Sequence, residues 1–449
     1  MTETPIMTPS NPTQGQPARL ASEYSGAVGK ILARVQAAYP KYIDLSLDRL
    51  TTLLHRLGNP ERSLPPVIHV GGTNGKGSTC AFIRTLAEAR QWRVHVMTSP
   101  HLVSVTERFR LAGALVQEDV LAATLEEVEA VNGDAPITVF EILTAAGFLL
   151  FAREPADLAI IEVGLGGRLD ATNVVSAPLA SVITPIGLDH QSFLGDSITE
   201  IAREKAGIIK PHCPVISAAQ DAAVTQIIEA AATTLGAPLW VMGRDVTYRV
   251  LPDGGMAYSD PHGDLTLPAP GLIGQHQYGN AALAIATLRG AVNDRMQNAD
   301  WAAITQTQWP GRLQKLGGSL LSHVPPGWEI WLDGGHNPHA GHALLPTLRN
   351  WQDRPLHLLI GMKSSKDIEG FIRPLLPYAT SVLAVMEPDQ YDAISVADIV
   401  AASGHVAIPG PDIVSALKKL SGETGRVLIC GSLYLAGAAL RRDNVFERA

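Results

Sequence analysis

The segment IHVGGTNGKGSTC, residues 68–80, constrains the fold of this chain most strongly, because an apolar run leads through a glycine-rich loop into a helical pattern. The apolar run predicts a buried strand. The residues after the loop predict a helix, because apolar side chains recur at the spacing of one helix face: Phe82, Ile83, Leu86 and Ala89. A strand, a glycine-rich loop and a helix in this order place backbone N–H groups where they can bind phosphate.

The loop departs from the usual phosphate-loop pattern, G-x-x-x-x-G-K-[ST]. Val70 stands where the first glycine belongs, and Lys76 is followed by Gly77, so that Ser78 comes one position late. The residues alone therefore leave two interpretations open. One is a nucleotide-binding loop of another kind, and the other is a glycine turn with an exposed lysine.

Apolar runs alternate with helical patterns along most of the chain, which predicts parallel sheets with helices on both faces and hence an α/β fold. The expected strands lie in residues 65–72, 93–100, 158–167, 179–187, 329–338, 356–362, 381–386 and 426–432. Between the two series, residues 240–270 alternate in polarity and contain D-G and G-G turns, which predicts hairpins.

A length of 449 residues predicts two or three domains. We expect a disordered tail over 1–20, which is rich in Thr, Pro and Gln and lacks the apolar run of a signal peptide. A larger α/β domain over 21–305, a linker over 306–312 and a smaller α/β domain over 313–449 then follow. The segment WPGRLQ, residues 309–314, marks the transition.

Composition excludes several classes of protein. The net charge of −8 argues against a nucleic-acid partner. The three cysteines are far apart and form no C-x-x-C pair, which argues against a disulfide framework or zinc site and fits the cytoplasm. The most apolar stretch, residues 137–152, is short for a membrane span and contains Glu141, so it predicts a buried helix.

Polar residues follow several of the predicted strands, at the edge of an α/β sheet where ligands bind. They are Ser99, Glu162, Asp189, His190, Asp333 and His336. Carboxylates and an imidazole at one sheet edge suit Mg²⁺ bound to phosphates. Taken singly, residues of these types are more often ordinary polar residues at turns and strand ends, and a lysine such as Lys205 more often lies on an exposed helix face.

Taken together, the motifs resemble those of the dihydrofolate synthase/folylpolyglutamate synthase family of the Mur ligase superfamily. The motifs that carry this resemblance are GGTNGKGS, TSPHL, TERFRL, TVFEILT, EVGLGGRLDATN, ITPIGLDH, IAREKAGIIK, WPGRLQ, LDGGHNPHA, IGMKSSKD and CGSLYLAG. The resemblance implies a Mur-ligase-like ATP-binding domain with a mostly parallel sheet and a smaller Rossmann-like domain that completes the glutamate-ligase site. It also implies that the loop at 71–78 is a shortened phosphate loop.

The resemblance implies roles for individual residues. ATP would be bound by Gly75, Lys76, Gly77, Ser78, Asn280, Arg312 and Asp333. Mg²⁺ would be bound by Ser99, Glu162, His190 and a carbamylated Lys205, with K⁺ as a further candidate cation. Lys76, Lys205 and His336 would carry catalytic roles. The pterin-binding segments would be Asp44, Leu45, Ser46 and Leu47, then Thr138, Val139, Phe140 and Glu141, then Leu169, Asp170 and Ala171.

Two positions depart from the family pattern. Ser46 stands where the family usually has glycine, and Gly335 where it usually has alanine. The first departure touches a predicted pterin-binding segment, and we expect the second to change only local packing.

The implied activity is that of an ATP-dependent acid–amino-acid ligase. It would join L-glutamate to dihydropteroate and then to reduced folates through an acyl phosphate, as a cytoplasmic monomer with no nucleic-acid or membrane partner. One alternative is polyglutamylation alone. A cell-wall Mur ligase would leave the pterin segments without a purpose, and a nucleotide-binding switch would leave Glu162, His190 and Lys205 unexplained.

Overall fold

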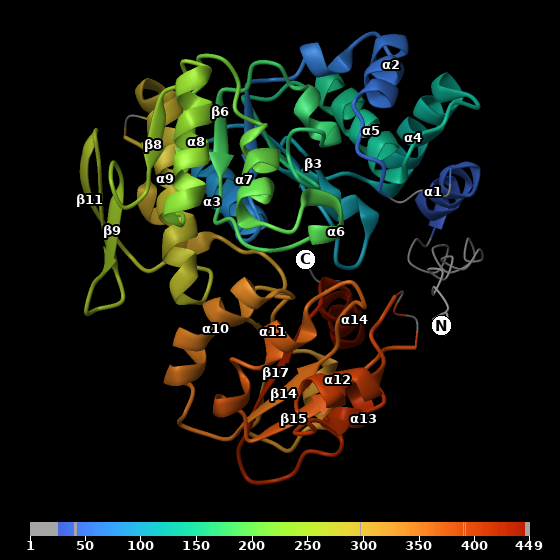
Figure 1. The fold of residues 1–449 in the computed structure, drawn as a ribbon, viewed down its shortest axis with the longest axis vertical. Helices are drawn as coiled ribbons and strands as arrows, with labels where there is room; N and C mark the ends of the chain where they lie inside the picture. The colour runs from blue at the N-terminus through green and yellow to red at the C-terminus, as the bar shows by residue number, and fades with distance from the viewer. Residues whose placement is uncertain (1–25, 40–42, 297, 389, 391, 445–449) are drawn as a thin grey trace, which may run out of the picture.

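Most of the chain folds into two α/β parts, and each part contains a β-sheet packed between helices (Figure 1). The computed structural model describes residues 26–39, 43–296, 298–388, 390 and 392–444. The predicted tail over 1–20 lies outside these residues. We call the parts built on the eight-stranded and six-stranded sheets the first and second α/β units. The α/β class predicted from the sequence is confirmed.

The sheet of the first unit is mostly parallel. Only the β2–β3 and β3–β4 pairs are antiparallel. Its strands are, in spatial order, β4 (Ala114–Leu115), β3 (Phe109–Leu111), β2 (Val94–Met97), β5 (Leu158–Glu162), β1 (Val67–Gly71), β6 (Ala180–Ile183), β7 (Val215–Ser217) and β8 (Leu239–Val241).

Strand β1 is central in this sheet and completely buried, as expected for a parallel strand with helices on both faces. It pairs with β5 and β6, and Val70 lies opposite Glu162 in the register. Because the parallel strands end at one edge, the loop after β1 and the carboxylate at the end of β5 lie at that edge together.

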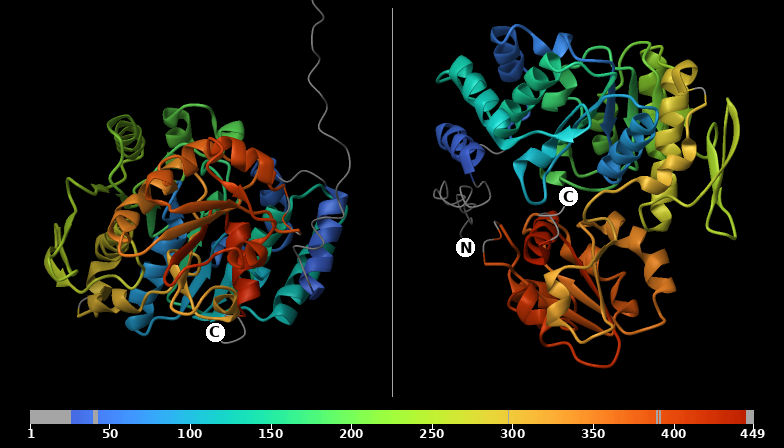
Figure 2. Two further views of the ribbon diagram at one scale, coloured as in Figure 1. Left: turned by 90° about the horizontal axis from the view of Figure 1, so that it is seen from below. Right: turned by 180° about the vertical axis from the view of Figure 1, so that it is seen from behind.

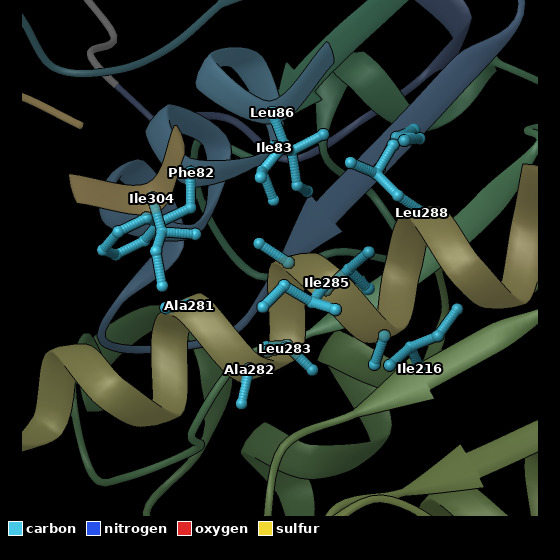
Figure 3. Packing of buried hydrophobic residues seen from close by; sticks show 14 of the residues in the cluster. Phe82, Ile83, Leu86, Ile216, Ala281, Ala282, Leu283, Ile285, Leu288 and Ile304 are labelled. Atoms are coloured by element: carbon cyan, nitrogen blue, oxygen red, sulfur yellow. The ribbon is translucent and has the colours of Figure 1, made fainter. Parts of the chain in front are cut away.

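Helices α3 (Lys76–Ala89) and α9 (Gln275–Val292) cover one face of this sheet. Figure 3 shows Ile83 and Leu86 of α3 close to Ile285 and Leu288 of α9 in the largest apolar core. Helix α3 begins at Lys76, so the predicted order of strand, glycine loop and helix is confirmed.

Helix α5 (Val139–Arg153) covers the opposite face and is buried along most of its length, which confirms the buried helix predicted over 137–152. It packs with α1 (Gly26–Ala38), α2 (Asp48–Arg56) and α4 (Glu118–Asn132). Three further helices follow β6 and β7: α6 (Gln191–Leu194), α7 (Ile198–Ala206) and α8 (Ala222–Thr234).

The hairpins predicted over 240–270 form a separate three-stranded antiparallel sheet. Its strands are β9 (Thr247–Val250), β10 (Met256–Asp260) and β11 (Gly263–Leu267). The buried Arg289 of α9 forms an ion pair with Asp260 at 3.0 Å, which fastens this sheet to the first unit.

The right-hand view of Figure 2 shows the second unit below the first. Its six-stranded sheet is parallel except for its first strand. Its strands are, in spatial order, β12 (Gln314–Leu316), β13 (Glu329–Leu332), β17 (Arg426–Cys430), β14 (Leu356–Ile360), β15 (Ser381–Ala384) and β16 (Ile408–Pro409). Apolar cores lie on both of its faces, and its helices are α10 (Pro338–Asn350), α11 (Ile368–Ile372), α12 (Val396–Ala402), α13 (Ile413–Leu417) and α14 (Leu433–Asp443).

The passage between the units contains a 3₁₀ turn, Trp301–Gln306, and then residues 307–313 before β12. The domain boundaries given by the sequence, 21–305, 306–312 and 313–449, stay a prediction. Over the residues that the structure describes, every helix is too short or too polar to span a bilayer.

The contact between α3 and α9 gives a prediction about stability. Ile285→Ala should lower the free energy of unfolding of the first unit by about 2–5 kcal/mol, because it leaves a cavity in a close-packed core. Urea unfolding followed by circular dichroism measures this loss. Val120→Ala, on an exposed face of α4, is the control and should change stability by less than about 0.5 kcal/mol. Equal losses in the two variants would contradict the assignment of this core.

Candidate active site

The loop after β1 is held in a conformation that only glycine fits at two positions. Gly72 and Gly75 have φ angles of 137° and 86°. A Cβ atom on Gly75 would lie 2.5 Å from Oδ1 of Asn280, so the predicted ATP-binding residue Asn280 lies against the loop. The loop is therefore a fixed structure that presents the N-terminus of α3 at the edge of the sheet.

Two polar groups of the loop fit a bound phosphate. Lys76 Nζ folds back and donates to the carbonyl of Thr73 at 3.1 Å, at the start of α3. The hydroxyl of Ser78 is buried, and no group among the described residues accepts or donates a hydrogen bond to it. A buried hydroxyl without a partner is costly, so the Ser78 hydroxyl is available to donate a hydrogen bond to a phosphate oxygen bound at the loop.

Two of the predicted metal ligands lie together. Glu162 is buried at the end of β5, and its Oε2 accepts a hydrogen bond from the backbone N–H of Ser99 at 3.2 Å. Burial raises the pKa of Glu162, and the nearby charges of Lys76 and Arg312 oppose that rise. A desolvated carboxylate beside a serine suits a hard divalent cation.

Lys205 lies beneath the same loop. It is buried, and its Nζ donates to the carbonyl of Gly72 at 2.8 Å. Burial, with a smaller contribution from the charge of Lys76, lowers the pKa of Lys205 to about 7. A neutral amine is the form that carbon dioxide can carbamylate, so the environment fits the predicted modification.

The fourth predicted ligand, His190, is not joined by a described contact to Glu162 or Ser99. It lies in a left-handed conformation at φ 53°, and its Nε2 lies 3.4 Å from Nζ of Lys366. Desolvation and the charge of Lys366 lower the pKa of His190 although 40% of its side chain is exposed, and the neutral ring is the form that binds a metal. Within the described ranges, no group of three or more His, Cys, Asp or Glu side chains forms a metal cluster.

Asp189 is the residue on which the two units converge. Its nearly buried carboxylate accepts hydrogen bonds from Lys366 Nζ at 2.5 Å and from Asn337 Nδ2 at 3.0 Å, and it lies 3.6 Å from His336 Nε2. Burial alone would raise the pKa of Asp189, but the nearby His336 ring and the charge of Lys366 hold it well below its usual range. The predicted catalytic residue His336 is thus placed by a carboxylate of the other unit.

The phosphate loop itself contacts the second unit. Asn74 and Asn337 exchange two side-chain hydrogen bonds, each 3.0 Å long. Asn337 also caps α10 by accepting from the N–H of Ala340. The start of α10 and the loop before α3 therefore meet at one junction. Asn74, Asn337 and Lys366 were not predicted as site residues, although each lies in one of the family motifs.

Arg312 and Asp333, both predicted to bind ATP, lie where the linker enters the second unit. The Asp333 carboxylate is buried and accepts from the backbone N–H groups of Leu313 and Gly335, at 3.0 and 2.7 Å. A Cβ atom on Gly335 would lie 2.8 Å from Asp333 Oδ1, so the departure from alanine at this position leaves room for that carboxylate. Asp333 thus has a structural task in addition to any contact with nucleotide.

Arg49 joins two of the predicted pterin segments. Its guanidinium lies 3.1 Å from Asp44 Oδ2 and 3.2 Å from Glu141 Oε1. Glu141 also closes a capping box with Thr138 at the start of α5. Arg49 was not predicted. It could have been found from the two predicted pterin segments, because carboxylates that come together out of water require a cation between them.

The predicted pterin segment 138–141 approaches the one at 169–171 through Phe140. A Cβ atom on Gly164 would lie 2.3 Å from the Phe140 ring, so this ring lies on the glycine-rich segment that leads to Asp170. Asp170 is buried and caps the 3₁₀ turn Ala171–Val174. In the first segment, Ser46 Oγ accepts from the N–H of Asp48 at 3.2 Å, a local turn bond that glycine could not make.

The chain matches two family models: the Mur ligase middle domain over residues 70–288 and the Mur ligase glutamate ligase domain over residues 311–433. It is 39% identical to the dihydrofolate synthase/folylpolyglutamate synthase of Escherichia coli, over 76% of this chain and 77% of that protein. It is 31% identical to the dihydrofolate synthetase of Saccharomyces cerevisiae, over 90% and 98%.

Solved structures agree with these matches. Escherichia coli FolC in complex with DHPP and ADP has a TM-score of 0.85 and 31% identity, covering 97% of this chain and 100% of that one. A Yersinia pestis bifunctional folylpolyglutamate synthase/dihydrofolate synthase complexed with AMPPNP and Mn has a TM-score of 0.80 and 28% identity, covering 96% and 99%.

The contacts of Asp189 give a prediction about the arrangement of the units. Lys366→Met leaves a desolvated carboxylate without its cation, which should weaken the contact between the units by about 3–5 kcal/mol. We expect a larger radius of gyration in small-angle X-ray scattering without nucleotide. Lys363→Met is the matched control, because Lys363 lies over the ring of Tyr434 at 3.8 Å and this contact is within the second unit. An unchanged radius for Lys366→Met would show that the pair does not hold the units together.

Proposed function

The chain belongs to the dihydrofolate synthase/folylpolyglutamate synthase family of Mur ligases, and from this membership we propose that it is an ATP-dependent ligase that joins L-glutamate to folates. The observation that carries the proposal is the junction at which the phosphate loop meets α10 through Asn74 and Asn337. A ligase of this kind needs nucleotide, acid and amine at one place. The form we propose is a monomer that acts in the cytoplasm.

The chemistry follows from the low reactivity of a carboxylate as an acyl donor. A carboxylate oxygen of the folate attacks the γ-phosphorus of ATP, and ADP leaves with the electrons of the broken P–O bond. The amine of L-glutamate then attacks the acyl carbon and loses a proton, and inorganic phosphate leaves as the amide forms. Lys76 offsets the charge that develops on the moving phosphoryl group. No nucleophilic side chain is required, because positioning and electrostatics do most of the work.

The nucleotide would be held by the loop and by residues of both units. We assign its phosphates to Gly75, Lys76, Gly77 and the orphaned hydroxyl of Ser78. Asn280, Arg312 and Asp333 would contact the rest of the nucleotide, with His336 near the phosphates. The unpartnered Ser78 hydroxyl is the observation that supports this assignment most directly.

A divalent cation is part of the proposal, and we assign it as Mg²⁺. Ser99, Glu162, His190 and a carbamylated Lys205 would hold it, since they supply hard oxygens and a neutral imidazole. When bound, such a cation would neutralise charge on the phosphates. K⁺ is kept as a further candidate, without residues assigned to it.

The acid substrate would lie between the three pterin segments. Arg49 brings Asp44 and Glu141 together, and Phe140 packs on Gly164. These contacts support a preformed pterin site, and we therefore propose both dihydropteroate and reduced folates as acceptors of glutamate. Polyglutamylation alone is the second candidate, because a folate tail can be extended without any recognition of free dihydropteroate.

An assay of substrate-dependent ADP release tests this proposal. With ATP, Mg²⁺ and L-glutamate, the purified protein should release ADP when given dihydropteroate and, separately, when given tetrahydrofolate. Activity with tetrahydrofolate alone would favour the second candidate. Release with neither acceptor would contradict the ligase. Lys76→Ala should reduce both activities by about a hundredfold or more, whereas Lys315→Ala, which removes an exposed ion pair with Glu329, should leave them within about twofold.

The carbamylation of Lys205 has its own test. Lys205→Ala should be nearly inactive, and added short carboxylates should restore part of its activity, because the group that is missing is an acid. ADP release with and without acetate or propionate measures the rescue. Lys76→Ala is the control, since it lacks an amine and should gain nothing. A Lys205→Ala variant that no carboxylate rescues would count against the modification.

A further inference from the structure

A buried chain of three polar side chains runs from the central strand to the proposed pterin site. His69 lies in the middle of β1 and is completely buried. Its Nε2 lies 2.8 Å from Oγ1 of Thr172. The Thr172 hydroxyl donates a short hydrogen bond to Oδ1 of Asp170, so its lone pair is what faces the histidine. His69 therefore carries its proton on Nε2 and donates it to Thr172.

The histidine is not explained by stability. Its neighbours in β1, Ile68 and Val70, are the apolar residues expected of a central parallel strand. Nδ1 of His69 is buried and finds no partner in the part of the chain that the structure describes. A buried ring nitrogen without a hydrogen bond is costly, and an apolar residue would avoid that cost. We therefore attribute the presence of a histidine here to the hydrogen bond between its Nε2 and Thr172.

Asp170 is the last of the three hydrogen-bonded side chains, and it fixes the segment 163–173. Its Oδ2 accepts from the N–H of Leu165 at 2.8 Å, and its Oδ1 also accepts from the N–H of Thr172 at 2.9 Å. The Asp170 carboxylate therefore closes the glycine-rich segment onto the turn that follows it. The Thr172 hydroxyl is a donor to this carboxylate, and His69 sets the direction in which that donor points.

The same segment connects both halves of the proposed site. It begins directly after Glu162, and the N–H of Arg168 donates to the carbonyl of Glu204 at 2.8 Å. A Cβ atom on Gly167 would lie 3.0 Å from Cα of Lys205, so the segment packs against the backbone of that lysine. Movement of the segment would therefore shift the surface under Phe140 as well as the backbone beside Lys205.

The ring of His69 stays neutral in this setting. Burial, with the charge of Lys210, lowers its pKa to about 3. Lys210 donates to the carbonyl of Asn173 at 3.2 Å and so lies at the end of the same segment. The donor on Nε2 is therefore present throughout the physiological pH range, as expected for a group with a fixed structural orientation.

We propose that His69 is a positioning residue for the acid substrate: through Thr172 and Asp170 it fixes segment 163–173 against the proposed pterin site. The inference rests on the proposed function, because the substrate is the folate-type acid named there. His69 does not touch the substrate. It acts through the shape of the segment, so its loss should affect the acceptor more than ATP.

Two substitutions at position 69 separate this role from simple packing. His69→Met keeps a similar volume but removes the donor, whereas His69→Gln can place an amide N–H near the position of Nε2. We expect His69→Met to raise the KM for dihydropteroate about tenfold or more while the KM for ATP stays within about twofold. His69→Gln should recover most of the loss. Steady-state ADP release, with each substrate varied in turn, gives both constants.

His95→Met is the matched control. His95 is a buried histidine of the neighbouring strand β2, but its ring nitrogens contact the carbonyl of Glu154 and the N–H of Ala112, away from the segment. It should change neither KM by more than about twofold. If both KM values rise together in His69→Met, or if His69→Gln is as impaired as His69→Met, the histidine is only a packing residue and the inference is wrong.

Thr172 provides a second test that does not depend on the folding of the His69 variants. Thr172→Val keeps the shape of the side chain but removes the hydrogen bonds that link His69 to Asp170, and Thr172→Ser retains the hydroxyl. The valine variant should show the same selective rise in the KM for dihydropteroate, and the serine variant should not. Equal behaviour of the two would overturn the inference. Wild-type protein that releases no ADP with any acceptor would instead defeat the proposed function, and this inference with it.

Discussion

The carboxylate of Asp189 is the group on which the arrangement of the site depends. It extends from the first unit, yet three groups that stabilise its charge come from the second: Lys366, Asn337 and His336. A buried carboxylate is stable only when such partners are present. The contact therefore joins the edges of two sheets that the chain builds separately, and the phosphate loop enters the same junction through the pair of Asn74 and Asn337.

This arrangement suits the proposed chemistry. An acyl phosphate reacts readily with water, so it must form where water is excluded and where the amine is already in place. A site shared by two units can open to admit three substrates and close to exclude solvent. Glu162 and Lys205 beside the phosphate loop, and Asp189 at the junction, have pKa values moved by burial and by their neighbours, as is common at functional sites.

Local patterns predicted the fold well, because the strand before Gly71, the helix from Lys76 and the hairpins of 240–270 are each encoded by adjacent residues. Ser99 and Glu162 were each placed at the end of a strand from the sequence, but their contact exists because β2 and β5 are neighbours in the parallel sheet, and local patterns do not encode that pairing across a separation of 63 residues. Lys366 could not be paired with Asp189 either, since 177 residues separate them and the pair exists only when the units meet. Arg49 was missed for a similar reason, because its two carboxylates come from different segments.

In the proposed reaction, the acid substrate is activated by phosphoryl transfer at this junction. The most direct measurement uses dihydropteroate whose carboxylate oxygens are both labelled with oxygen-18, incubated with the protein, ATP and L-glutamate. Each molecule of inorganic phosphate released should carry one labelled oxygen, because the C–O bond of the acyl phosphate breaks when the amide forms. Phosphate that contains only unlabelled oxygen would contradict this mechanism.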